Sequence, residues 1–134
     1  MRTDRIAILV AALAALVVAA TATAAKQSSS LTLVVLGSSP AAAVASAPAQ
    51  GGQITFNVST TETDHPSVNV RCYQGGAWVY DGWQSFWAGA PEPVFTLSSN
   101  YWTSGAAACT ARLVYYDRRG RLQTLATTGF HVDG

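Results

Sequence analysis

The stretch GAAACTARLVYYD, residues 105–117, alternates small or apolar residues with polar ones. Every second position carries one of Ala107, Cys109, Ala111 and Leu113. A period of two residues places such side chains on one face of a β-strand and their neighbours on the other. The pattern therefore predicts a strand with one buried face.

The same period, or a β-prone composition, recurs through most of the chain. Turn signals separate the segments, among them Gly75-Gly76, which suits a tight hairpin, and Asp117–Gly120. Asp81-Gly82 interrupts one aromatic segment. No segment after residue 25 shows a helical stripe, so we expect an all-β sandwich of about seven strands over residues 31–132. The six further predicted strand segments are residues 31–36, 52–60, 66–76, 77–87, 95–99 and 122–132.

Residues 1–25 have the three parts of a secretory signal peptide. Two arginines in the first five residues precede an uncharged apolar run over residues 6–20, and small residues follow. The pattern predicts a signal-peptide helix, cleaved after Ala24 or Ala25, and a secreted, extracellular protein that meets the membrane only through this export signal. The alternative is an uncleaved membrane anchor, because residues 6–25 are long enough to span a bilayer.

The rest of the chain fits one domain. We divide it into a part with leader, first strand and an Ala/Pro/Ser-rich loop (residues 26–52) and the main part of the sandwich (residues 53–134). The formal net charge is only +1, and 11% of residues are charged. A nucleic-acid partner is not expected, because it calls for a basic face.

The chain contains two cysteines, Cys72 and Cys109. In an exported protein an even count favours a disulfide, and both residues are in phase with the inward sets of their predicted strands. A reactive thiol or a metal site is the alternative, but a matching histidine spacing is lacking. We therefore predict a structural disulfide.

These segments resemble an immunoglobulin-like β-sandwich, and also a group of small secreted bacterial proteins that consist of one such domain and lack an assigned activity. The resemblance implies a Greek-key fold in which residues 52–60, 66–76, 95–99, 105–117 and 127–132 correspond to strands B, C, E, F and G. It also implies that residues 31–36 are strand A and residues 77–87 strand C′. Because strands C and F are neighbours in that fold, the bridge would join two strands of one sheet. Trp102 would fill part of the core volume that a strand C tryptophan usually occupies.

Aromatic residues crowd the segment around residues 78–87. Rings exposed on a sheet face can stack on sugars or anchor a protein partner, whereas buried rings would only complete a modest core. Adjacent residues of a strand face opposite ways, so we expect part of this aromatic surface to be exposed. The candidate ligand-binding residues are Trp78, Tyr80, Trp83 and Trp87.

Arg118, Arg119 and Arg121 form a second candidate binding group at a predicted hairpin tip. They would hold an acidic polymer, a phosphate or a carboxylate, unless they are simply a solvated turn. His65 and His131 have no metal-ligand spacing, and we expect His131 to point outward. The sequence shows no nucleophile elbow and no phosphate-binding glycine loop.

These observations predict a non-enzymatic secreted binding or adhesion module without a cofactor, whose partner is a protein or a cell-surface glycan. One alternative is a carbohydrate-binding module with an aromatic platform, which three aligned, exposed rings would support. A second is a structural decoration domain of an envelope or a virion. A secreted enzyme would need a polar cleft with clustered titratable groups.

Overall fold

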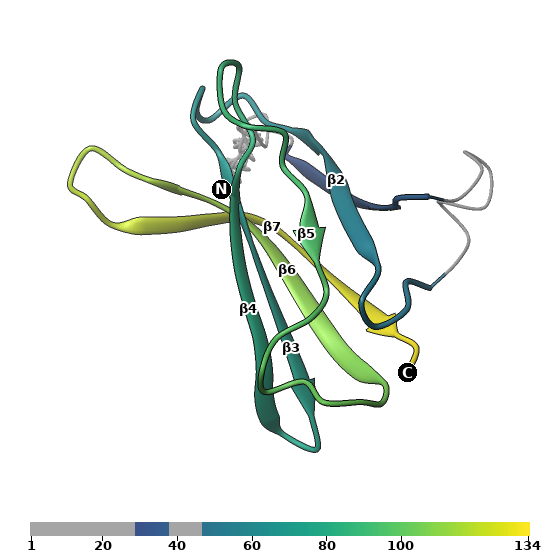
Figure 1. The fold of residues 1–134 in the computed structure, drawn as a ribbon. Helices are drawn as coiled ribbons and strands as arrows, with labels where there is room; N and C mark the ends of the chain where they lie inside the picture. The colour runs from purple at the N-terminus through teal and green to yellow at the C-terminus, as the bar shows by residue number, and fades with distance from the viewer. Residues whose placement is uncertain (1–28, 38–46) are drawn as a thin grey trace, which may run out of the picture.

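The computed structural model describes residues 29–37 and 47–134, in which the chain forms a sandwich-like arrangement of two antiparallel sheets (Figure 1). The three-stranded sheet has the order β1-β2-β5, and the four-stranded sheet has the order β4-β3-β6-β7. The predicted signal peptide lies outside the described residues, as do residues 38–46 of the predicted loop. The strands are β1 (Ser30–Val35), β2 (Gln53–Ser59), β3 (Ser67–Gln74), β4 (Ala77–Ser85), β5 (Phe95–Thr96), β6 (Ala107–Tyr116) and β7 (Leu122–Val132).

The core lies between the two sheets and is built from the alternating apolar positions. Ile54, Val70 and Leu113 come from three different strands, and all are fully buried. Phe56 packs edge-on against Phe95, with ring centroids 5.8 Å apart, so aromatic contacts link β2 to β5. Burial of these side chains is the main term that stabilises a domain of this size.

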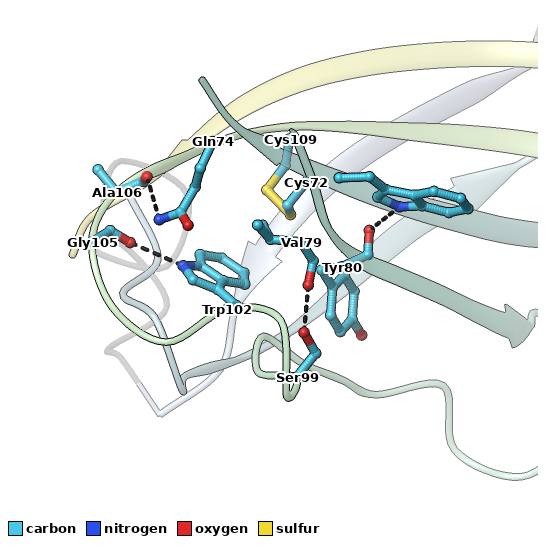
Figure 2. The surroundings of a disulfide bond; sticks show 10 residues. Cys72, Gln74, Val79, Tyr80, Ser99, Trp102, Gly105, Ala106 and Cys109 are labelled. Atoms are coloured by element: carbon cyan, nitrogen blue, oxygen red, sulfur yellow. Dashed lines mark hydrogen bonds between the residues drawn. A yellow bond between two sulfur atoms is a disulfide. The ribbon is translucent and has the colours of Figure 1, made fainter. Parts of the chain in front are cut away.

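A disulfide joins Cys72 of β3 to Cys109 of β6, as predicted (Figure 2). The two residues are directly opposite in the β3–β6 register, and their Cα atoms are 4.0 Å apart. The bond therefore ties two neighbouring strands within one sheet. Both cysteines are buried in the core, next to the small side chains of Ala107 and Ala111.

The hairpin turns also follow the sequence, with one exception. Gly75 and Gly76 join β3 to β4, and both have the positive φ that the two central residues of a tight two-residue hairpin turn require. Asp81-Gly82, however, does not interrupt its segment, because β4 runs through it without a break. Gly82 is needed there: an added Cβ would lie 2.5 Å from the hydroxyl oxygen of Tyr80, whose ring covers the glycine on the inner face.

The β6–β7 hairpin is long and extends beyond the sandwich (Figure 1). Its register shifts between Leu113 and Val114, where Leu125 is the extra residue of a β-bulge. A bulge increases the local twist and bends the strand, which explains how the tip diverges from the other strands. Directly after the other end of β7, Asp133 forms a parallel bridge with Ala49 and backbone hydrogen bonds with Pro48 and Gln50.

Candidate binding face on the four-stranded sheet

The four-stranded sheet has an outer face that points away from the core, and β3 and β4 form one part of it. In β3 the side chains of Val70 and Cys72 point inward, so Asn69, Arg71 and Tyr73 occupy the outer positions. The β4 residues opposite these three are Trp83, Asp81 and Trp78 in turn. We call these six residues the β3–β4 face.

A polar network connects three strands across this face. Asn69 is fully buried, and its Nδ2 donates to Asp81 Oδ1 at 2.5 Å and to the Gly82 carbonyl oxygen at 3.1 Å. Its Oδ1 accepts a hydrogen bond from Arg112 Nη2 of β6 at 3.0 Å. Both N–H donors of the buried amide and one lone pair of its oxygen therefore have partners, as is usual for a buried polar group. The network fixes where the Asp81 carboxylate points.

Arg71 and Trp78 form a stacked pair beside that network. The guanidinium carbon of Arg71 lies 4.8 Å from the centroid of the Trp78 ring, and Arg71 Nε lies 3.7 Å from Asp81 Oδ1. Trp78 Nε1 donates to the Tyr80 carbonyl oxygen at 2.7 Å. A cation–π contact and a hydrogen bond together hold the indole in one orientation.

Three aromatic rings of the face remain open to solvent. The exposed fraction is 52% for Trp78, 44% for Trp83 and 37% for Tyr73. Of the four aromatic residues predicted as ligand-binding, the structure brings together Trp78 and Trp83 on this face. It places Tyr80 and Trp87 elsewhere.

Tyr80 points inward, because it is the register partner of the buried Cys72. Its ring is half-buried and lies 6.4 Å from that of Trp102. Burial raises the pKa of the Tyr80 hydroxyl, and the nearby Asp81 charge raises it further. Trp87 follows the end of β4, is half-buried and lies 5.3 Å from the ring of His65.

A half-open groove of about 530 Å³ runs along the free edge of β4, next to the loop that follows β5. Trp78 and Tyr101 are its exposed aromatic residues, and Tyr101 is 81% exposed. Such a volume is within the usual range for small-ligand sites. The lining residues are Trp78, Val79, Tyr80, Asp81, Ser98, Ser99 and Tyr101.

The loop that forms the second wall of the groove is firmly anchored (Figure 2). Ser99 Oγ donates to the Val79 carbonyl oxygen of β4, and the Tyr101 amide donates to Ser99 Oγ at 3.1 Å. Trp102 is buried, as predicted, and its Nε1 donates to the Gly105 carbonyl oxygen at 3.0 Å. These contacts set the position of Tyr101 before any ligand arrives.

The second predicted group, the arginines of the β6–β7 tip, is organised around Asp117. Asp117 Oδ1 accepts hydrogen bonds from the amides of Arg119 and Arg121, both at 2.9 Å. These bonds, led by that from Arg121, lower the pKa of the Asp117 carboxyl group. The Arg121 side chain also pairs with Asp117, at 3.4 Å. Arg118 and Arg119 remain exposed, at the tip of the hairpin that extends beyond the sandwich (Figure 1).

Sequence reasoning missed Tyr73, Tyr101, Asn69 and Arg112 as parts of the site. An outer position opposite Trp78 was a usable signal for Tyr73, but nothing in the sequence placed Tyr101 beside β4. His131 is exposed, as predicted. Within residues 29–37 and 47–134, no three His, Cys, Asp or Glu side chains are grouped as they would be to hold a metal ion.

The described part of the chain contains no helix with the length and hydropathy needed to cross a membrane. Comparison of the chain with known protein families, with curated proteins and with solved structures finds no match.

Proposed function

We propose that the chain is a secreted, non-enzymatic binding module with an immunoglobulin-like fold, and that the β3–β4 face is its contact surface. The strand order supports the fold assignment: β1-β2-β5 and β4-β3-β6-β7 correspond to strands A-B-E and C′-C-F-G of that fold. The Cys72–Cys109 disulfide supports an oxidising, extracellular location.

The observation that carries the proposal is the exposure of three aromatic rings around a fixed polar network. Tryptophan, tyrosine and arginine are the residues that contribute most to binding free energy at interfaces. On this face Asn69 and Trp78 Nε1–H have intramolecular partners that hold the face in shape. A partner would therefore meet preorganised rings and lose little free energy to ordering them.

A retention assay tests this proposal. The purified protein is passed over whole cell envelopes and insoluble polysaccharides, and the bound fraction is measured. We expect retention on at least one surface and its loss in Trp83→Ala, because Trp83 is exposed on the face and has no ring contact among the described residues.

Tyr116→Ala is the matched control, since Tyr116 is a more exposed aromatic residue, at 68%, near the tip of the β6–β7 hairpin. Retention of Trp83→Ala at the level of the unmodified protein would contradict the proposal. Absence of retention on every surface would favour a structural decoration domain instead.

A further inference from the structure

We infer that the groove between β4 and the loop over residues 98–101 binds a neutral pyranose unit of a glycan. This inference rests on the proposed binding function and assigns its ligand class. The groove is a place on the β4 edge where an exposed indole, an exposed phenol and a carboxylate lie around one hollow. Its polar and apolar groups select among the possible ligands.

The first selecting feature is the state of the indole N–H. In grooves that take proline-rich peptides, aromatic side chains line the site and the peptide offers carbonyl oxygens, which need donors. Trp78 Nε1–H already donates to the Tyr80 carbonyl oxygen at 2.7 Å. The indole therefore presents its ring and no free donor, which disfavours such a peptide.

The second feature is the capped edge of β4. A peptide that adds as a further strand pairs with free backbone groups at a sheet edge. Beside the groove, the carbonyl oxygens of Val79 and Tyr80 already accept hydrogen bonds from Ser99 Oγ and from the Trp78 indole. The edge is thus blocked to an added strand at the level of the groove.

The third feature is the hydrogen-bonding capacity that remains free on the walls of the groove. Asp81 Oδ1 accepts a hydrogen bond from Asn69, whereas Oδ2 has no hydrogen-bond partner among the described residues. A carboxylate oxygen is an acceptor only, so the ligand must bring donors. The Ser98 and Tyr101 hydroxyl groups, which lie on the other wall, accept or donate.

A ligand that fits must therefore combine an apolar flat face with several hydroxyl donors. Pyranose rings have this combination: axial C–H groups on a face and hydroxyl groups at the rim. Among the described residues, those that line the groove include no Lys, Arg or His, and Arg71 beside them has its Nε 3.7 Å from Asp81 Oδ1, so the lining offers no unpaired positive charge to an acidic sugar. We therefore assign a neutral sugar.

The test uses the purified protein and soluble cello-, malto-, chito- and xylo-oligosaccharides. Binding is measured by calorimetry, and the site is mapped by the indole N–H signals of the four tryptophans in nitrogen–proton spectra. We expect one oligosaccharide class to bind and to shift the Trp78 signal more than the Trp83 signal. Tyr101→Ala should weaken binding roughly tenfold or more, and Tyr101→Phe should retain most of it.

Tyr101 suits this test because its side chain is 81% exposed and removing its ring leaves the core intact. Failure of every neutral oligosaccharide to bind would overturn the assignment. So would unchanged affinity in Tyr101→Ala, or a Trp78 shift caused only by a proline-rich peptide. If these results occur while Trp83→Ala still abolishes retention on envelopes, only the sugar assignment fails and the binding face stands.

Discussion

Replacement of Asn69 by alanine tests the polar network that shapes the β3–β4 face. Asn69 is fully buried and makes three hydrogen bonds: to Asp81, to the Gly82 carbonyl oxygen and from Arg112. Asn69→Ala removes all three and leaves the carboxylate and the guanidinium without their shared amide. Because these bonds join β4, β3 and β6, their loss should lower the stability of the whole four-stranded sheet.

The size of the effect follows from the partners. A hydrogen bond to a charged group contributes about 1.5–3 kcal/mol and a neutral one about 0.5–1.5 kcal/mol. The side chain of Asp81 is 28% exposed and Arg112 is half-buried, so water replaces part of the hydrogen bonding that each loses. We therefore discount the two charged bonds and expect a loss of about 2–3 kcal/mol. For a domain of this size the melting temperature should fall by roughly 10–20 °C.

Urea unfolding followed by circular dichroism measures this loss. Thr110→Ala is the matched control, because Thr110 is an exposed residue of the same outer face. The control should change the unfolding free energy by no more than about 0.5 kcal/mol. If Asn69→Ala is as mild as the control, the network does not hold the face and the argument for preorganisation is refuted.

Four further predictions concern the core and the hairpin. The double variant Cys72→Ala/Cys109→Ala removes a disulfide between residues that are 37 apart in the sequence, and its free energy of unfolding in urea should fall by about 4 kcal/mol. An unchanged unfolding midpoint would mean that the bond does not stabilise the fold. Gly82→Ala forces its Cβ against the Tyr80 ring and should cost about 1–3 kcal/mol by the same assay; equal stability would show that the ring moves aside freely. Burial raises the folded-state pKa of Tyr80, so the folded protein favours the neutral hydroxyl. The stability that the neutral Tyr80 contributes is fully present below pH ~10, the unfolded-state pKa, and is lost as the pH rises through the folded-state pKa. Tyr80→Phe should therefore flatten the alkaline limb of the stability curve, and an unaltered limb would contradict this. The pKa of Asp117 is lowered, so its stabilising effect is present above the unfolded-state value and is lost as pH falls through the folded-state one. A carboxyl titration by NMR should give a midpoint below the ordinary aspartate value, and an ordinary midpoint would mean that the tip bonds are absent in solution.

The strands and the disulfide were predictable because each follows from a local pattern. Alternation in residues 66–76 and 105–117 indicates which side chains point inward, and Cys72 and Cys109 each fall in the inward set of their strand. The continuity of β4 was not predictable in this way. Asp81-Gly82 has the composition of a turn, but the glycine is used to accommodate the Tyr80 ring, which is a tertiary contact.

The candidate site was predictable only in part. Counting aromatic residues identified the right strand, yet a β-bulge between Cys72 and Tyr73 shifts the pairing beyond the Tyr73–Trp78 pair, and Tyr80 rather than Val79 lies opposite Cys72. Such a shift alters which side chains share a face. Tyr101 lies on a loop whose position depends on the buried anchor Trp102, so its place beside β4 follows from packing between distant segments.

The most direct test of the binding face is a hydrogen-exchange footprint of the protein bound to the envelope fraction that retains it. We expect slower amide exchange in residues 77–85 and 98–101 when the partner is present, because these segments carry the exposed rings of Trp78, Trp83 and Tyr101 and form the groove. Residues 115–123 at the hairpin tip should exchange as fast as in the free protein. Protection confined to the tip, with unchanged exchange in residues 77–85, would contradict binding at the β3–β4 face and would place the contact surface on the arginine-rich hairpin.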